Sequence, residues 1–285
     1  MQPPIRNALS VDVEDWFQVG AFEKVIDRAE WDNLPVRVER NGDAVLALFD
    51  KAGVKGTFFT LGWVAERFPA LMRRIADAGH EVASHGWDHQ RVFTMEADIF
   101  RADLRRARHA IENAAGMKVT GYRAPSFSID QRTPWAHQVL AEEGYAYSSS
   151  VAPIAHDHYG WREAPRFAFR PLADAPLIEL PVTTVEVGGR RAAAGGGGFF
   201  RLLPYQFSSW AIRRVNGQEG RPAVFYFHPW EIDPGQPRLA HAPLKSRMRH
   251  YTNLSKMEPK LLKLLRSFAW ERTDAVVGCE RERLQ

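Results

Sequence analysis

Short apolar runs alternate with longer amphipathic stretches along most of this chain, and this alternation restricts the fold more than any other feature. The runs have the length and side-chain content of strands, and the stretches between them repeat apolar residues at helical spacing. We expect strands at 8–13, 56–61, 80–84, 119–123, 145–148, 177–183 and 223–227. We expect helices at 43–52, 64–78, 96–115 and 133–143. Strands and helices in this order predict a parallel α/β barrel.

Polar side chains suited to chemistry follow several of the expected strands. Asp12 lies near the end of the first strand, and His85 comes directly after the strand at 80–84. Arg123 ends the strand at 119–123, and His228 follows the strand at 223–227. In a parallel barrel the carboxyl ends of the strands meet at one face, which is where the active sites of barrel enzymes lie. We therefore expect these side chains to share that face.

Two histidines close together give this face the composition of a metal site. His85 and His89 are separated by three residues, and Gly86 between them allows a tight bend. Two imidazoles from such a short segment can bind one ion. The same spacing also occurs between unrelated histidines, so the interpretation depends on a further ligand.

A cluster of carboxylates at the end of the first strand could supply that ligand. Asp12, Glu14 and Asp15 lie within four residues. Alternate residues of a strand share a face, so Asp12 and Glu14 should point the same way, whereas Asp15 follows where the strand becomes a loop. A solvated strand end is the alternative explanation. The apolar residues before the cluster argue against it, because carboxylates beside a core need a cation or hydrogen bonds.

Composition narrows the functional classes. The chain has 285 residues, of which 45% are hydrophobic, and this is enough for a large core. The net charge is +4, but Lys and Arg are interspersed with acidic residues, so we expect no nucleic-acid partner. Cys279 is the only cysteine, which excludes an intramolecular disulfide.

The N-terminal segment 1–7 runs into the first strand without an apolar signal core. No run of about 18 apolar residues, the length that a membrane-spanning helix needs, occurs in the sequence. We therefore expect a cytoplasmic protein.

Five regions of the chain, taken in order, resemble the polysaccharide deacetylases with a NodB-homology domain (carbohydrate esterase family 4). They are residues 10–15, 84–89, 121–125, 145–150 and 225–229. The resemblance covers most of the chain and implies a distorted (β/α) barrel with fewer than eight regular strands. A narrower resemblance, carried by 12–17, 228–234 and 249–251, is to the branch found in exopolysaccharide gene clusters linked to exosortase sorting systems. It implies one domain over 1–285, in which 229–285 is an extension packed on the barrel.

The resemblance implies a divalent metal held by His85, His89 and one carboxylate. Zinc is the default ion for such a set, with cobalt, nickel and iron as alternatives. The family has two adjacent aspartates, whereas Val13 and Glu14 separate Asp12 from Asp15 here. The residue type favours Asp15 as the ligand, and an ungapped register favours Glu14. We predict Asp15 and keep Glu14 as the alternative.

The catalytic roles implied by the resemblance agree with the chemistry of the side chains. Asp12 would take a proton from the attacking water, His228 would protonate the leaving amine, and Arg123 would keep Asp12 ionised and oriented. A structural salt bridge is the alternative for Arg123, and a hydrogen-bonded strand-end histidine is the alternative for His228. The resemblance implies an Asp that orients this histidine where the chain has Ser148. Either another acidic group, such as Glu231, raises the pKa of His228, or the pKa is lower than in an Asp-bearing enzyme.

Aromatic residues and a proline in the same loops are candidates for substrate binding. Flat apolar faces suit the C–H faces of sugar rings, and packing at the mouth of the barrel is the alternative. The predicted substrate-binding residues are Trp16, Trp87, Pro125, Phe127 and Trp230.

Together with these residues, the resemblance implies a metal-dependent hydrolase that removes N-acetyl groups from N-acetylhexosamine units in exopolysaccharide biosynthesis. The expected partner is an N-acetylated polysaccharide or oligosaccharide, or a lipid-linked precursor reached at the inner face of the cytoplasmic membrane. A metal-independent amidase acting on a small amide is one alternative, which the presence of His85 and His89 disfavours. A catalytically silent carbohydrate-binding relative is another, which Asp12 and His228 disfavour. The sequence leaves the oligomeric state open.

Overall fold

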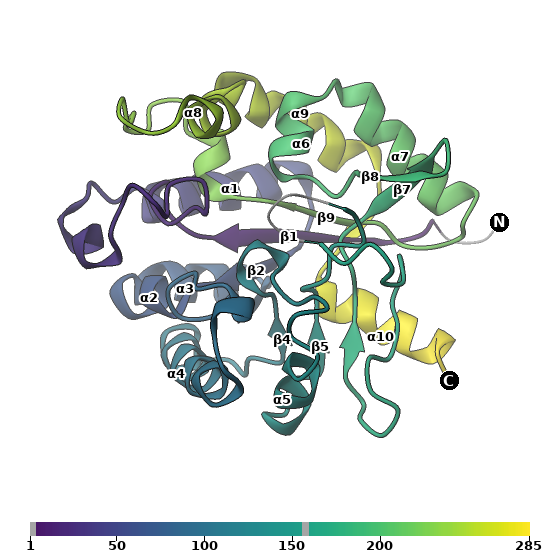
Figure 1. The fold of residues 1–285 in the computed structure, drawn as a ribbon. Coiled ribbons are helices and arrows are strands. Elements are labelled where there is room, and N and C mark those ends of the chain that lie inside the picture. Colours follow the sequence, from purple (N-terminus) through teal and green to yellow (C-terminus); the bar gives the residue numbers. More distant parts are fainter. Residues whose placement is uncertain (1–3, 156–159) are drawn as a thin grey trace.

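The structure describes residues 4–155 and 160–285. Within them, eight strands form one sheet, and these strands pair with one another in parallel. The structure is a computed structural model, and its sheet curls so that helices lie outside it (Figure 1). The N-terminal segment considered above lies partly outside the described residues. The strands of the sheet are β1 (Asn7–Val13), β2 (Thr57–Thr60), β3 (Glu81–Ser84), β4 (Gly121–Tyr122), β5 (Tyr147–Ser148), β6 (Ile178–Glu179), β9 (Val224–Phe227) and β10 (Trp270–Glu271).

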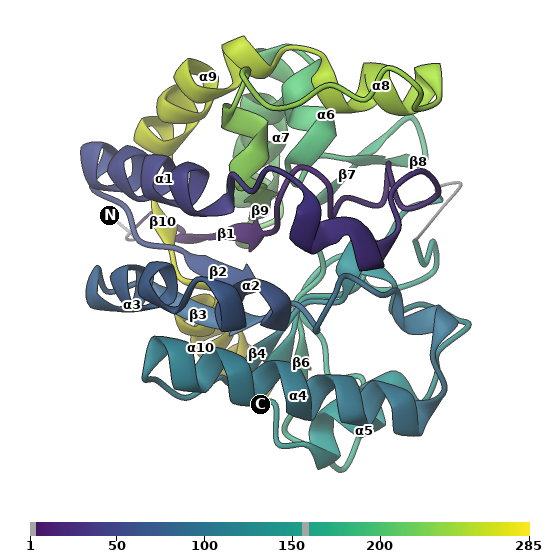
Figure 2. The ribbon, with the colours of Figure 1, turned by 90° about the vertical axis from the view of Figure 1, so that its left-hand side faces the viewer.

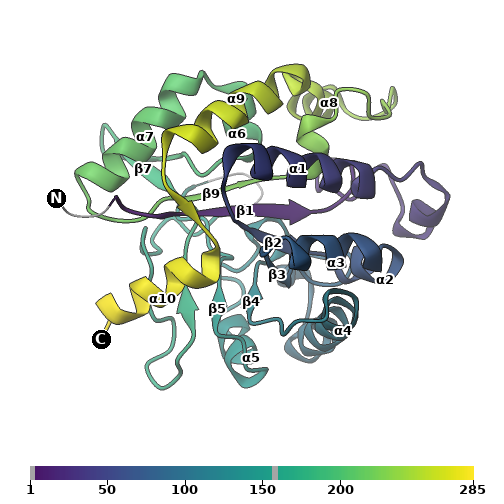
Figure 3. The same cartoon turned by 180° about the vertical axis from the view of Figure 1, so that it is seen from behind.

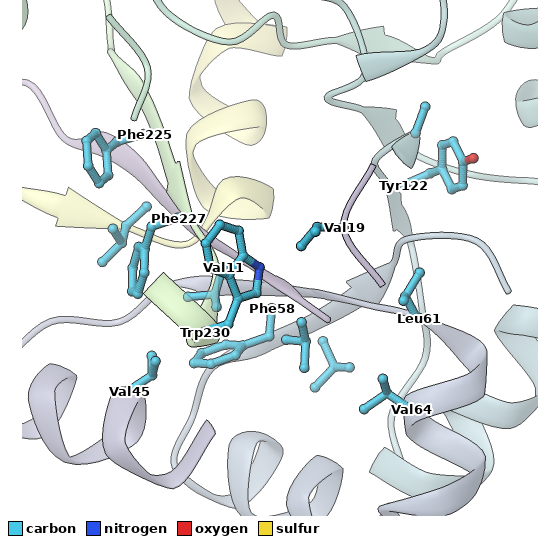
Figure 4. Packing of buried hydrophobic residues seen from close by; sticks show 14 of the residues in the cluster. Val11, Val19, Val45, Phe58, Leu61, Val64, Tyr122, Phe225, Phe227 and Trp230 are labelled. Atoms are coloured by element: carbon cyan, nitrogen blue, oxygen red, sulfur yellow. The ribbon is translucent and has the colours of Figure 1, made fainter. Parts of the chain in front are cut away.

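The first strand, β1, is the centre of the sheet. One edge of β1 pairs with β9, with Val11 opposite Phe227. The other edge pairs with β10 at its start and with β2 further along, where Asp12 lies opposite Phe59. All seven residues of β1 are buried, as expected of a parallel strand that is covered on both faces. Figure 4 shows Val11, Phe58, Phe227 and Trp230 packed around this strand.

The ring of strands closes through irregular chain between β6 and β9. The N–H of Thr183 donates to the Val224 carbonyl at 3.4 Å, and the N–H of Val224 donates to Oγ1 of Thr183 at 2.6 Å. Further on, the N–H of Tyr226 donates to the Gly195 carbonyl at 2.8 Å. A hairpin of β7 (Thr184–Val187) and β8 (Arg190–Ala193) leaves the barrel at this point. The structure thereby confirms the predicted distorted barrel, and β4, β5, β6 and β10 have only two residues each.

The helices surround the sheet. In Figure 1, α1, α6, α7, α8 and α9 lie on one side of β1, and α2 to α5 lie on the other. Their bounds are α1 (Val38–Ala52), α2 (Gly62–Arg67), α3 (Pro69–Asp77), α4 (Ala97–Ala115), α5 (Ala136–Glu142), α6 (Gly197–Leu202), α7 (Tyr205–Gly217), α8 (Leu244–Tyr251), α9 (Leu254–Ser267) and α10 (Thr273–Arg283). Short 3₁₀ helices are η1 (Arg28–Asn33), η2 (Val92–Thr94), η3 (Pro125–Phe127) and η4 (Pro229–Ile232).

The single helix expected at 64–78 is in fact two helices, α2 and α3. Pro69 begins α3, and the residue before it, Phe68, adopts φ −125° and ψ 54°. Proline has no N–H for the helix ladder and disfavours helical geometry in the preceding residue, which explains the break.

The C-terminal part of the chain returns to the first strand. The buried face of α9 carries Leu254, Met257, Leu261, Leu264 and Leu265. After it, β10 pairs with the start of β1, and α10 ends the chain beside the sheet (Figure 3). Within the described ranges, no helix combines the length and apolar character needed to cross a membrane. The carboxyl end of β1 faces the viewer in Figure 2, where the loops that build the site lie.

Candidate active site

Glu14, His85 and His89 come together beyond the carboxyl ends of β1 and β3. Each offers one nitrogen or oxygen atom, and these atoms all lie within 4.8 Å of one another. All three side chains are buried. In residues 4–155 and 160–285 they form the only cluster with the composition of a metal site.

His85 is held with one ring nitrogen free for a ligand. The main-chain N–H of His85 donates to the Thr60 carbonyl at the end of β2. The ring nitrogen Nδ1 lies 2.8 Å from the Arg123 carbonyl. A carbonyl oxygen can only accept, so Nδ1 carries the proton and Nε2 keeps its lone pair. Burial lowers the pKa of His85 to about 4, which keeps the ring neutral at physiological pH, as metal binding requires.

The loop that carries His89 is fixed from two sides. The carbonyls of Gly86 and Trp87 accept hydrogen bonds from Gly62 and Trp63 at the start of α2. The N–H of Trp87 lies 3.2 Å from both carboxylate oxygens of Asp103 on α4. His89 itself has φ 62°, a left-handed conformation that costs energy for this residue type and often occurs at functional sites.

Glu14 supplies an ionised carboxylate with one unused oxygen. Its Oε1 accepts from Nε1 of Trp230 at 3.1 Å. Its Oε2 is buried without a hydrogen-bond donor among the described residues and lies 2.9 Å from Nε2 of His89. Burial raises the pKa of Glu14, but the neighbouring imidazoles of His89 and His228 outweigh it and lower the pKa to about 2.

Two imidazole nitrogens and one carboxylate oxygen are the donor set that zinc prefers, and the buried free oxygen of Glu14 is the kind of atom that a cation would satisfy. The residues present therefore fit a divalent ion.

Asp15 lies in a different environment, and the structure reverses our order of preference between the two carboxylates. Its Oδ1 accepts from the N–H of Trp16 at 2.8 Å. Its Oδ2 accepts from the N–H groups of Arg37 and Val38 at 2.6 and 2.8 Å, where α1 begins. Both oxygens are thus used by main-chain donors, and the carboxylate caps the positive end of a helix. Glu14 takes the place beside the histidines instead.

Asp12 is paired with Arg123. Nη1 of Arg123 donates to Oδ1 of Asp12 and to Oγ of Ser10, both at 2.7 Å. Nε and Nη2 donate to the carbonyl and the hydroxyl of Ser149 at 3.1 and 3.0 Å. The guanidinium is fully buried and stacks at 4.1 Å from the centre of the Phe59 ring. These contacts fix the ion pair in one geometry.

His228 has an acidic partner three residues further along. Its Nδ1 lies 3.0 Å from Oε1 of Glu231, and its Nε2 lies 3.5 Å from Oε1 of Glu14. Burial lowers the pKa of His228, but the charges of Glu14 and Glu231 outweigh it and raise the pKa to about 9. Ser148 donates instead to Oγ of Ser150. Glu231 therefore supplies the acidic partner of His228 that Ser148 does not provide.

The predicted substrate-binding residues are all buried. Trp16 is 1% exposed, and its indole N–H donates to the Pro35 carbonyl at 3.0 Å. Trp87 lies under the guanidinium of Arg106, at 3.4 Å from the ring centre. The others, Pro125, Phe127 and Trp230, are also buried. Packing at the barrel mouth, the alternative explanation, agrees with this burial.

Several supporting residues were missed in the sequence. Ser10 holds Arg123, and its position two residues before Asp12 on the same strand face could have indicated this role. Ser149 and Asp103 carried no such signal, because their partners lie on other elements. His250, which stacks on Trp230 with ring centres 4.1 Å apart, is likewise a contact across distant segments.

Comparisons with known families divide the chain into two parts. Residues 30–148 match the family described as polysaccharide deacetylase. Residues 149–278 match a domain of unknown function (DUF3473). The second segment includes His228, Trp230 and Glu231.

One curated relative is the peptidoglycan deacetylase of Helicobacter pylori, which is 33% identical over 107 residues. The aligned segment is 38% of this chain and 36% of that protein, so the chain matches about a third of the relative's length.

Two solved structures share the fold. One comes from Mycobacterium smegmatis, from a protein assigned to the polysaccharide deacetylases, with 20% identity, a TM-score of 0.63, and coverage of 99% of this chain and 95% of that one. The other is an allantoinase with 12% identity, a TM-score of 0.61, and coverage of 96% and 89%. At these identities the likeness concerns the fold alone.

Proposed function

We propose that this chain, whose residues 30–148 match the polysaccharide deacetylase family, hydrolyses the N-acetyl amide bonds of N-acetylhexosamine units in a polysaccharide. The observation that carries the proposal is the joint placement of three kinds of group at one end of the barrel. These are a metal-type cluster, a carboxylate held by a buried arginine, and a histidine paired with a buried acid.

Glu14, His85 and His89 would hold the divalent ion, with zinc as the default. Such an ion lowers the pKa of water and polarises a carbonyl, which is the chemistry that amide hydrolysis needs. The free Oε2 of Glu14 and the unprotonated Nε2 of His85 support this assignment.

Asp12 is the base. Arg123 donates to only one of its oxygens in the hydrogen bonds described, and this charge-assisted bond orients the carboxylate. Asp12 takes the proton from the attacking water as the new C–O bond forms. Arg123 acts through Asp12, so it is a positioning residue.

His228 is the acid. The pKa of about 9 that Glu14 and Glu231 produce against the effect of burial means that the ring carries a proton at neutral pH. His228 gives this proton to the amide nitrogen as the C–N bond breaks, so acetate and a free amine leave. Glu231 compensates the charge of the protonated ring through Nδ1.

The substrate and the cellular place rest on resemblance. The curated relative acts on peptidoglycan according to its name, whereas the motifs at 12–17, 228–234 and 249–251 resemble enzymes of exopolysaccharide gene clusters. We assign the chain to exopolysaccharide biosynthesis, acting on the polymer or its lipid-linked precursor in the cytoplasm at the inner face of the membrane. Cell fractionation tests the location.

We also treat 1–285 as one domain with 229–285 as its extension, which the pairing of β9 and β10 with β1 supports.

The deciding experiment incubates zinc-loaded protein with peptidoglycan fragments, oligomers of N-acetylglucosamine and N-acetylated exopolysaccharide. Acetate and free amine are measured together, with Asp12→Asn as the inactive control. Equal amounts of both products support the proposal. Hydrolysis of a small amide without acetate release from any glycan would favour the amidase, and glycan binding without hydrolysis would favour the silent relative.

A further inference from the structure

Trp230 donates a hydrogen bond to the carboxylate proposed as a metal ligand. Its Nε1–H lies 3.1 Å from Oε1 of Glu14, and both residues are buried, at 5% and 2% exposure. The two oxygens of Glu14 therefore differ. Oε1 faces the indole, and Oε2 is left for the position beside His89. We infer that Trp230 is a positioning residue, which orients Glu14 so that one chosen oxygen faces the metal position.

The indole is itself held in place by aromatic stacking. Its ring is nearly parallel to that of His250, with an interplanar angle of 13° and a centroid distance of 4.1 Å. It also stacks on His228, at 20° and 5.2 Å. His250 packs further against Phe22, at 4.5 Å. A ring confined in this way has few alternative rotamers, so the direction of its N–H is fixed.

A hydrogen-bond network fixes the backbone of Trp230. Nε2 of Gln236 donates to the carbonyls of Trp230 and Asp233, at 2.9 and 3.0 Å. Oε1 of Gln236 can only accept, so Nε2 of His250, at 2.5 Å, is the donor to it. Burial lowers the pKa of His250 well below its usual value, so the ring stays neutral. Gln236 thereby joins the main chain of η4 to the last turn of α8.

The end of α8 is anchored by a buried arginine from α6. Nη1 of Arg201 donates to the carbonyls of His250 and Thr252, at 2.7 and 2.8 Å, and Nη2 donates to that of Arg249, at 2.7 Å. These are carbonyls at the negative end of a helix, where a guanidinium is favoured. Arg201, which is 3% exposed, therefore holds His250 against Trp230.

Apart from Phe22, these supports lie in residues 149–278, the segment that matches the domain of unknown function. The carboxylate that they orient, Glu14, lies at the other end of the chain. We conclude that one role of this C-terminal segment is to complete the geometry of the metal site. This role rests on the proposed function, because it presumes that Glu14 is a ligand.

The test compares two Trp→Phe variants of the full chain. Trp230→Phe keeps a flat ring in the stack and removes the N–H. Trp270→Phe is the matched control, because Trp270 is 7% exposed in β10 and its indole donates to a main-chain carbonyl instead. Zinc affinity is measured by competition with a chromophoric chelator. We expect Trp230→Phe to bind zinc about tenfold to a hundredfold more weakly, as is usual when a partner of a ligand is lost, and Trp270→Phe to match wild type.

Cobalt provides a readout that a merely structural role would not change. The visible spectrum of bound Co²⁺ reports the ligand geometry, so it should change in Trp230→Phe and not in Trp270→Phe. Zinc affinity within twofold of wild type together with an unchanged cobalt spectrum in Trp230→Phe would overturn the inference. If wild type itself binds no metal, the proposed function fails first, so the two failures are distinguishable.

Gln236→Leu provides a second variant if Trp230→Phe does not fold. It keeps the indole and releases the main chain of Trp230 and the ring of His250. We expect weaker zinc binding and a changed cobalt spectrum here as well. A folded Gln236→Leu variant with wild-type zinc affinity and spectrum would count against the inference.

Discussion

Replacing Glu14 and Asp15 by their amides, one at a time, should show which carboxylate is a metal ligand and which one caps a helix. Glu14→Gln neutralises the oxygen that lies beside His89 without a hydrogen-bond donor in the described chain. Asp15→Asn changes an acceptor that serves the N–H groups of Arg37 and Val38 at the start of α1. We expect Glu14→Gln to lose the metal and keep its stability, and Asp15→Asn to keep the metal and lose stability.

The size of the Asp15→Asn effect follows from its hydrogen bonds. The carboxylate accepts from three main-chain N–H groups, and an amide has only one oxygen. At least one of the buried donors then loses its acceptor. Such a bond to a charged group contributes about 1.5–3 kcal/mol, so the free energy of unfolding should fall by about 2–3 kcal/mol. For a domain of this size the melting temperature should fall by about 4–12 °C.

The assay measures both properties on the same preparations at pH 8, above the pKa of about 6 to which burial raises Asp15. Each variant is loaded with zinc and freed of excess metal by gel filtration, and zinc per protein is measured by mass spectrometry. Unfolding is followed by circular dichroism in chelator, so that bound metal adds no stability. Glu30→Gln, at an exposed position, is the control. Full zinc content in Glu14→Gln and a stable, metal-free Asp15→Asn would refute the reasoning and restore Asp15 as the ligand.

Further predictions concern the other groups of the site. His85→Ala and His89→Ala should each lose bound zinc, measured as metal per protein, with an unchanged far-ultraviolet dichroism spectrum, and full metal content in both would exclude them as ligands. Asp12→Asn should lower kcat for acetate release by about a hundredfold or more with metal still bound, and near-normal turnover would assign the base elsewhere. Glu231→Gln removes a charge that raises the pKa of His228, so the alkaline limb of the pH–kcat profile should move to lower pH. If the alkaline limb stays at the same pH in Glu231→Gln, a group other than His228 titrates in this limb.

The central strands could be predicted from sequence because their signal is local. The expected strands at 8–13, 80–84 and 223–227 correspond to β1, β3 and β9 within one residue at either end. Each is an apolar run bounded by a change of pattern, and each is buried along nearly its whole length.

The closing side of the barrel could not be predicted in the same way. The stretch expected as a strand at 177–183 has regular pairing only at β6 (Ile178–Glu179). Beyond it, Thr183 bonds to Val224 with its side chain as well as its main chain. Whether an apolar run pairs regularly depends on the position of its neighbour, and that position is set by the rest of the fold.

The burial of the aromatic residues could not be predicted from the sequence, for a related reason. Trp230 and Glu14 are 216 positions apart, and neither residue type indicates the other as its partner. Trp230 is an aromatic side chain that both a sugar platform and a packed core would use. Only the arrangement of η4 and α8 around its ring decides between the two.

Two sequence arguments differed on whether Glu14 or Asp15 lies beside the histidines, and the structure agrees with the argument from strand alternation. Alternation along a strand predicts that Asp12 and Glu14 share a face, and the charges of both act on the rings of His85 and His228. Preference by residue type favoured Asp15, but it ignores that β1 ends at Val13. Beyond that point the chain turns, and the carboxylate of Asp15 points to the start of α1 instead. The backbone therefore places the carboxylate of Glu14 beside the histidines and the carboxylate of Asp15 at the start of α1.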